Sequence, residues 1–375
     1  MPNSAGSDIA SKSPRVNSNS AALNYAFADI TDDELKRLEG ANGLEKLGLF
    51  HTSITDTGVS YLKELKNLKV LDLGFTNITD EGLAHLKGLV NLRLLVLNST
   101  RITTAGLSHL KGLLCLEGLD LAFTRIDDEA LELLSRLQRL RLLVLNRAQM
   151  SPAGLMVLGH TQITDNGLWR LRVLRNLEAL DLAHTRITDA GLAYLKQLSE
   201  LKILDVSFTQ VTAAGVMHLK GLTKLRMLLL NHTPIDEVGL MHLSESATNL
   251  EGLALASTQI TGAGLAQLKN LTKLRTLFLD HSQVTDASLA HLKSLPDLEC
   301  LNLAFTQLTD AGLPYLSELA SLKKLNLRGT EVSNAGVSTL EKLDRLHKLD
   351  ISYTQVSEQE AQALQQALPA CDIAY

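Results

Sequence analysis

The sequence repeats itself with a period of 24 residues along most of its length. The phrase L-x-x-L-x-L-x-x-T-x-I-T-D-x-G-L-x-x-L-x-x-L recurs with little drift, for example from Leu68 to Leu89 and from Leu177 to Leu198. Thirteen copies of its L-x-x-L-x-L portion are present, the first at Leu44 and the last at Leu346. Because a repeat this short cannot bury its own apolar face, neighbouring repeats must stack into an array. A conventional globular core is therefore excluded.

Each repeat changes its hydrophobic period part-way through. The L-x-L portion alternates apolar and polar residues, which predicts a short strand with one buried face. From I-T-D onward the apolar residues follow helical spacing, as Leu83, Leu86 and Leu89 do, and Thr79 or Asp80 is suited to cap that helix. Since helices are wider than strands are spaced, the stack should bend. We predict an α/β solenoid, or horseshoe, with a parallel sheet on its concave face and helices on its convex face.

These motifs resemble the leucine-rich repeat over nearly the whole chain. The I-T-D-x-G-L opening and the 24-residue period are similar to bacterial GALA-like arrays and to the repeats of eukaryotic F-box substrate receptors. Thr stands where the family usually has Asn or Cys. We expect its hydroxyl to donate a hydrogen bond to a backbone carbonyl of the neighbouring turn. The resemblance implies a protein-recognition module.

The sequence divides into five parts. Residues 1–22 are rich in Ser, Asn and Ala and predict a disordered polar tail, and residues 23–43 predict an N-terminal cap. The solenoid follows over 44–357, and residues 358–375 predict a capping helix and tail. At 147–160 the repeat is irregular, because the spacing of the Thr position falls once to 13 residues. This step is either a tolerated deletion or a binding feature.

Composition and motifs argue against several classes of function. The net charge of −5 provides no basic field for nucleic acid, and no apolar run approaches the roughly 20 residues that span a bilayer. Three distant cysteines form no metal motif, and no hydrolase, zinc-protease or nucleotide-binding motif is present. All eleven histidines fall into repeat register. We considered a metal at His160, His184 and Asp181 but found no third ligand fixed, so we expect no catalytic residue, metal or cofactor.

The position before the Thr is the most informative column of the repeat. Ten of its fourteen occupants are aromatic or His. The full column is His51, Phe75, Ser99, Phe123, Arg147, His160, His184, Phe208, His232, Ser257, His281, Phe305, Gly329 and Tyr353. One interpretation is a structural ladder in which each ring covers the backbone of the next turn. The other is a protein-contact stripe, because aromatic residues are enriched at the cores of interfaces. The ten aromatic and His residues are our first candidate binding set.

A second column, between the two strand leucines, is rich in acids. It contains Asp72, Asp120, Asp181 and Asp205, and Asp280 adds one acid in the neighbouring position. Such a row is either a solvated strand face or a contact for a partner with a basic or mixed surface. These five aspartates complete the candidate binding set.

Together these features predict a non-enzymatic scaffold that binds a protein partner on its concave face. The alternative is the substrate-recognition subunit of a ubiquitin-ligase-type complex. That alternative is weaker because no F-box and no catalytic domain are visible in the sequence. We expect a monomer, and the free cysteines and missing Sec signal favour the cytoplasm, with export by a non-Sec route left open.

Overall fold

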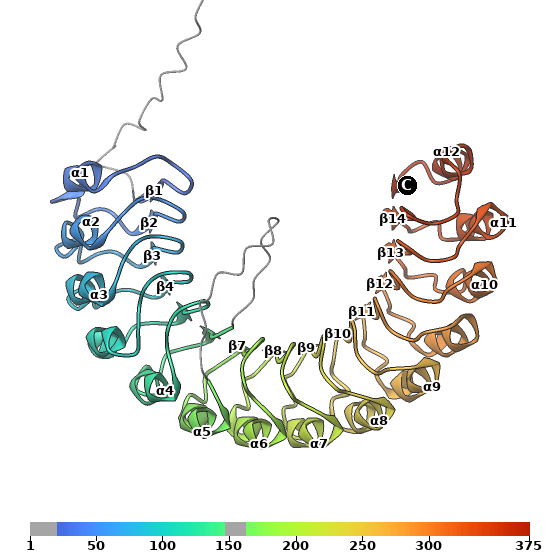
Figure 1. Ribbon diagram of the computed structural model, residues 1–375, viewed down its shortest axis with the longest axis horizontal. Helices are drawn as coiled ribbons and strands as arrows, with labels where there is room; N and C mark the ends of the chain where they lie inside the picture. The colour runs from blue at the N-terminus through green and yellow to red at the C-terminus, as the bar shows by residue number, and fades with distance from the viewer. Residues whose placement is uncertain (1–20, 147–162) are drawn as a thin grey trace, which may run out of the picture. The chain divides into compact units, whose positions relative to one another are not determined.

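The computed structural model describes residues 21–146 and 163–375. The chain forms two compact units, Met1–Asp120 and Leu121–Tyr375, called unit 1 and unit 2 below. Both are built from short parallel strands that alternate with α-helices and 3-10 helices, the latter labelled η (Figure 1). The predicted α/β solenoid is therefore confirmed.

In unit 1 the strands pair in chain order from β1 to β5. The register is set by the repeat, since Leu71 pairs with Leu95 and Leu95 with Leu119. The elements are β1 (Ala22–Asn24), α1 (Asp32–Leu35), η1 (Lys36–Leu38), β2 (Lys46–Gly48), α2 (Asp56–Ser60), β3 (Val70–Asp72), α3 (Asp80–Leu86), β4 (Leu94–Val96), η2 (Gly106–Gly112) and β5 (Gly118–Asp120).

In unit 2 the strands pair in chain order from β6 to β15. The strands are β6 (Leu142–Val144), β7 (Ala179–Asp181), β8 (Ile203–Asp205), β9 (Met227–Leu229), β10 (Gly252–Ala254), β11 (Thr276–Phe278), β12 (Cys300–Asn302), β13 (Lys324–Asn326), β14 (Lys348–Asp350) and β15 (Asp372–Ala374). From β7 to β14 they line the inner side of a curved row whose outer side carries the helices (Figure 1).

The helices of unit 2 are mostly single turns, many of which tighten into a 3-10 helix. They are α4 (Asp128–Leu134), α5 (Asp165–Leu168), η3 (Trp169–Val173), α6 (Asp189–Leu192), η4 (Ala193–Gln197), α7 (Ala213–Val216), η5 (Met217–Leu219), α8 (Glu237–Ser246), α9 (Gly262–Leu265), η6 (Ala266–Asn270), η7 (Asp286–Ser294), η8 (Asp310–Gly312), α10 (Leu313–Leu316), α11 (Asn334–Val337), η9 (Ser338–Lys342) and α12 (Glu358–Ala367).

Leucines fill the space between the strands and the helices. Leu71 and Leu180, at the centres of β3 and β7, are at most 1% exposed, and Leu83 and Leu86 on α3 are equally buried. Full burial of one such side chain contributes roughly 1.5–3 kcal/mol. The stacking of repeats is therefore driven by the positions that define the motif.

The ends of the chain add strands to the sheet. Ala22, which the sequence assigned to the polar tail, lies in β1, and Asp372–Ala374 form β15 rather than an irregular tail. Near the N-terminus, Thr31 and Glu34 form a capping box at α1. The other predicted domain limits remain predictions. Residues 1–20 and the core of the irregular step, 147–162, lie outside the described residues.

No helix within 21–146 or 163–375 is long and apolar enough to cross a membrane.

Candidate protein-binding face

The aspartate of I-T-D joins consecutive repeats on the helix side. Asp165 accepts the backbone N–H of Thr188 at 2.9 Å and its hydroxyl at 2.6 Å. The same pair of bonds recurs at Asp32–Thr55, Asp56–Thr79, Asp80–Thr103, Asp128–Thr164, Asp189–Thr212, Asp286–Thr309 and Asp310–Ser333. Thr79 is the N-cap, whereas Asp80 reaches the next repeat. Sequence reasoning considered these residues only as caps within one repeat.

The glycine of I-T-D-x-G-L is required by the same joint, that is, by the contact of the aspartate with the next repeat. A Cβ at Gly106 would overlap Asp80 Oδ1 and lie 2.7 Å from Asp80 Cγ. The aspartate of one repeat thus occupies the space that a side chain would need in the next. The T-D-x-G motif therefore holds neighbouring repeats together.

The Thr column closes the turn of its own repeat. Thr209 Oγ1 donates to the carbonyl of Val206 at 2.6 Å, and Thr185 donates to Leu182 in the same way. Both side chains are buried. Our expectation that the hydroxyl reaches the neighbouring turn was wrong. The acceptor lies three residues earlier because the chain turns back sharply after the strand.

The residue before the Thr lies in the left-handed region of the backbone. The φ angles of His184, Phe208 and His232 are 56°, 57° and 52°. This conformation directs each N–H to the next repeat, as from Phe208 to the carbonyl of Asn231 at 2.8 Å. For a residue other than Gly it costs roughly 1–2 kcal/mol. Bulky side chains are therefore held at positions where Gly would fit with less strain.

In unit 2 these side chains stack on one another. The rings of His184 and Phe208 are 3.8 Å apart and 12° from parallel, and Phe208 lies 4.1 Å from His232. We call His184, Phe208 and His232 the ring row. Phe208 is still 43% exposed. A ring packed on both faces by its neighbours leaves its edge to the solvent, so the two interpretations of this column are compatible.

The other members of the column in unit 2 are separated from the ring row. His281 stacks on Phe305 at 4.6 Å, and Phe305 covers Gly329, whose Cβ would lie 2.5 Å from the ring. Tyr353 is exposed beneath the Arg328 guanidinium, 4.2 Å from its ring centroid. Phe123 has the same left-handed backbone, and its N–H donates to the carbonyl of Asn146 at 3.1 Å.

In unit 1, His51 and Phe75 belong to an aromatic cluster that also contains Phe27 and Phe50. Phe50 lies 5.1 Å from Phe75, and Phe27 lies 5.4 Å from His51. Phe27 has a positive φ as well, so this column begins one repeat earlier than the candidate set did. His160, the remaining candidate, lies outside the described residues.

The acids of the strand column are engaged by the turn that follows them. Asp205 accepts the N–H of Ser207 at 2.8 Å, and Asp181 accepts that of Ala183 at 3.0 Å. Asp72 accepts the N–H of Gly74 in the same way. Burial raises the pKa of both Asp72 and Asp205, and for Asp205 the bonds from Ser207 and the nearby His184 oppose that rise. These carboxylates are parts of turns as well as members of a polar row.

The remaining two predicted acids have different surroundings. Asp280 accepts a hydrogen bond from Asn302 Nδ2 at 2.8 Å, which links two neighbouring repeats. Asp120 ends β5 at the limit of unit 1. The five aspartates are thus divided between the two units, with Asp72 and Asp120 in unit 1 and Asp181, Asp205 and Asp280 in unit 2.

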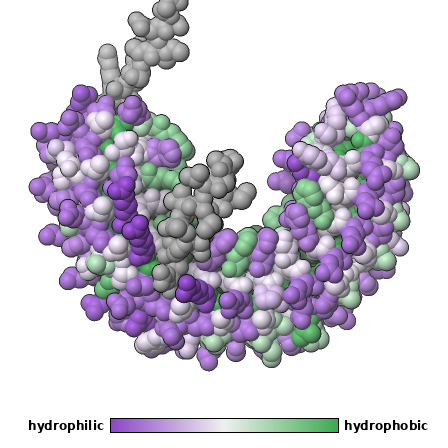
Figure 2. Space-filling view, viewed as in Figure 1, coloured by the Kyte–Doolittle hydropathy of each residue, from purple (hydrophilic) through white to green (hydrophobic). Residues whose placement is uncertain are grey.

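Sequence reasoning missed a third column, the first residue of each strand. It faces the same side of the sheet as the acids, because successive side chains of a strand alternate. In β6, β8 and β9 it contains Leu142, Ile203 and Met227, of which Ile203 is 46% exposed. Hydrophobic residues lie among hydrophilic ones along the strand-lined side of unit 2 (Figure 2). The column is chemically mixed, and Gly118 and Gly252, which begin β5 and β10, are buried, so no shared residue type or exposure marks it in the sequence.

Reactive side chains do not gather in the described part of the chain. Residues 21–146 and 163–375 contain no group of three or more His, Cys, Asp or Glu that could hold a metal ion. Because His160 lies outside them, the metal trio considered above is not tested. Burial raises the pKa of the Cys300 thiol, and burial together with Asp372 raises the pKa of Cys371 to about 11.

Comparison with known families agrees with this architecture. A family model described as leucine rich repeat matches residues 42–102 and 175–235, and a second matches 294–317 and 318–340. The chain is a leucine-rich repeat protein. Leucine-rich repeat proteins generally mediate protein–protein interaction. No curated protein matches the sequence.

Solved structures of leucine-rich repeat proteins share the fold. An internalin from Listeria monocytogenes is 24% identical with a TM-score of 0.63, over 92% of this chain and 88% of that chain. A leucine-rich repeat protein from Leptospira interrogans is 20% identical with a TM-score of 0.58, over 93% of this chain and 95% of that one. At these identities the similarity concerns the fold alone.

Proposed function

We propose that this leucine-rich repeat protein is a non-enzymatic scaffold that binds a protein partner on the strand side of unit 2, with the ring row as the main contact. The observation that carries this proposal is Phe208, which is held in a left-handed conformation, packed between two imidazoles and still half-exposed. A rigid ring of this kind supplies contact area with little loss of conformational entropy on binding.

The surroundings of the ring row support the same proposal. Ile203 and Met227, which begin β8 and β9, add apolar side chains to the strand face that precedes Phe208 and His232 in the chain. Polar groups at Asp205 and Asn231 flank them. An apolar centre with a polar border is the usual composition of a protein interface.

Affinity capture with matched variants tests the proposal. The strand-side variant is H184A/F208A/H232A, and the control is Y194A/M217A/V238A, which removes exposed apolar side chains from η4, η5 and α8 on the helix side. We expect proteins captured from native lysate by the wild type to be retained by the control and lost by the strand-side variant. Circular dichroism establishes that both variants are folded.

A cross-linking measurement locates the contact directly. A photoreactive phenylalanine analogue at position 208 should cross-link the captured protein, and the same analogue at Tyr194 should not. Equal capture by the wild type and the strand-side variant, or cross-linking from position 194 alone, would contradict the proposal.

A further inference from the structure

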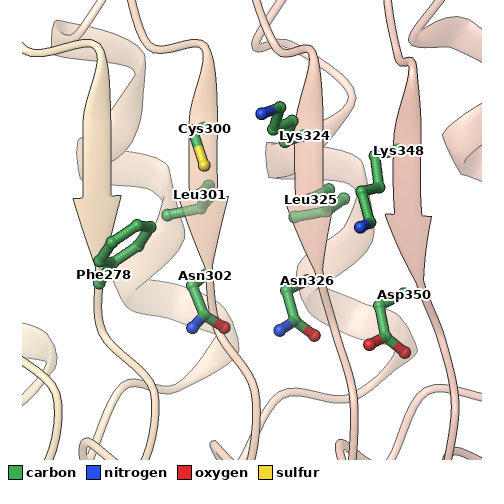
Figure 3. Close-up of a pocket in the computed structure, with 9 residues that line it drawn as sticks. All are labelled: Phe278, Cys300, Leu301, Asn302, Lys324, Leu325, Asn326, Lys348 and Asp350. Atoms are coloured by element: carbon green, nitrogen blue, oxygen red, sulfur yellow. The ribbon is translucent and has the colours of Figure 1, made fainter. Parts of the chain in front are cut away.

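Another part of the strand face in unit 2 is hollowed. A cavity of about 260 Å³ lies over β11 to β14, and Phe278, Cys300, Asn302, Lys324, Lys348 and Asp350 are among its lining residues (Figure 3). Its size suits one side chain of a partner with part of the adjoining backbone. The charges and hydrogen-bonding groups of the lining indicate which kind of side chain the cavity can bind.

Two lysines begin neighbouring strands in the cavity. Lys324 of β13 pairs in register with Lys348 of β14, and both are exposed. Each side chain leans toward the preceding strand (Figure 3). Neither ammonium has a hydrogen bond or an ion pair with any residue in the part of the chain that the structure describes. Like charges directly opposite each other in a sheet are destabilising.

The adjacent column shows the opposite arrangement. In the residues immediately before β11, β12 and β13, Glu299 lies between Arg275 at 3.3 Å and Lys323 at 2.9 Å. The cations there alternate with a carboxylate that pairs with both. The two lysines of the cavity lack such an acid between them, and a carboxylate from outside would complete the same pattern.

The other end of the cavity supplies different hydrogen-bonding groups. Asn326 Oδ1 accepts the N–H of Arg328 at 3.0 Å, while its Nδ2 donates to no residue in the described ranges. Asp350 is held by the N–H of Ser352 at 3.0 Å and lies two residues along β14 from Lys348. Asp372 of β15 pairs in register with Lys348 on its other side, without an ion pair. The cavity is therefore positive near Lys324 and can accept N–H donors near Asp350.

We infer that this cavity binds an acidic side chain of a protein partner, with its carboxylate between Lys324 and Lys348 and its own backbone amide near Asp350. The inference rests on the proposed function and names the chemistry of a second contact on the same strand face. Ammonium groups bound to a carboxylate form charge-assisted hydrogen bonds, which are stronger than neutral ones. An acidic residue is thus selected over a neutral isostere.

Binding of a fluorescent alternating Glu-Gly peptide to the full-length protein tests the inference. We expect K324Q/K348Q to weaken binding by about tenfold or more, because two charge-assisted bonds are lost. The matched control K202Q/K323Q removes the same charge from two lysines that already pair with Glu178 and Glu299, and should weaken binding by less than about threefold. The neutral Gln-Gly peptide should not bind the wild type.

Cys300 reports where the peptide lies. Because its thiol lines the cavity, the Glu-Gly peptide should slow its alkylation and leave Cys115 of unit 1 unaffected. Equal losses in the two lysine variants, equal binding of the Gln-Gly peptide, or tighter binding of a phosphoserine-Gly peptide would each overturn the inference. None of these results depends on the ring row, so capture that is lost in H184A/F208A/H232A would still support the proposed function.

Discussion

In unit 2, Asp189 and Asp205 belong to two columns that recur at the repeat spacing, and their carboxylates bind different parts of the molecule. Asp189 on the helix side accepts both the N–H and the hydroxyl of Thr212 in the next repeat. Asp205 on the strand side accepts the N–H of Ser207, two residues later in its own turn. The first carboxylate joins repeats, and the second shapes a single turn.

The difference supports the proposal that the strand side of unit 2 binds the partner. On the helix side both oxygens of Asp189 accept hydrogen bonds from Thr212 of the next repeat. On the strand side the turn uses backbone groups and leaves ring edges and strand side chains exposed, as at Phe208 and Ile203. In the proposed function, stability and recognition therefore depend on different columns of the same repeat.

The largest expected effect comes from a change that breaks the helix-side joint. In G106A the new Cβ would overlap Asp80 Oδ1 and disrupt the hydrogen bonds that Thr103 donates to Asp80. Overpacking and loss of these bonds should destabilise the protein by about 3 kcal/mol. Urea unfolding followed by circular dichroism measures the loss.

Gly112 provides the matched control in the same 3-10 helix, η2. Its added Cβ would lie no closer than 3.9 Å to its nearest neighbour, the carbonyl of Lys87. We expect G112A to change the stability by less than about 1 kcal/mol, since it fits without strain. Similar losses in the two variants would mean that helix geometry, rather than the joint, requires Gly106.

The period of the sequence was enough to predict the strands, the helices and the buried leucines. The role of Asp80 could not be predicted, because a Thr-Asp pair before a helix is also the ordinary pattern of a cap within one repeat. Its partner, Thr103, is 23 residues away and becomes a neighbour only after the repeats stack. The exposed column of Ile203 and Lys324 was missed for another reason: its residues share a position and no chemical type.

In the ring row, the free-energy cost of the left-handed backbone can be measured separately from the contribution of ring stacking. Both F208A and F208G remove the ring, and each should destabilise the protein because contacts with His184 and His232 are lost. At a φ of 57°, however, only Gly is free of the clash of Cβ. F208G should therefore be more stable than F208A by about 1 kcal/mol in urea unfolding.

Gln210 gives the reference for this comparison. It is exposed, lies two residues beyond Phe208 and is not among the residues with positive φ. There we expect the usual order, in which Q210A is more stable than Q210G by about 0.5–1 kcal/mol. If Ala were the better residue at both positions, the left-handed conformation would not be a source of strain in the ring row.

The smallest expected effect concerns the charge of Asp205. Burial raises its pKa in the folded protein, so its ionisation costs stability as the pH rises through that value, and the cost is absent below the unfolded pKa of roughly 3.9. In D205N the amide oxygen can still accept the N–H of Ser207, as Asn302 accepts that of Ala304. D205N should therefore be as stable as the wild type at neutral pH or more stable, by less than about 1 kcal/mol, and this difference should shrink near pH 4. D205A lacks the acceptor and should be the least stable of the three at both pH values in urea unfolding. A D205N variant clearly less stable than the wild type at neutral pH would show instead that the carboxylate charge stabilises the turn, and the two aspartate columns would then differ less than their contacts indicate.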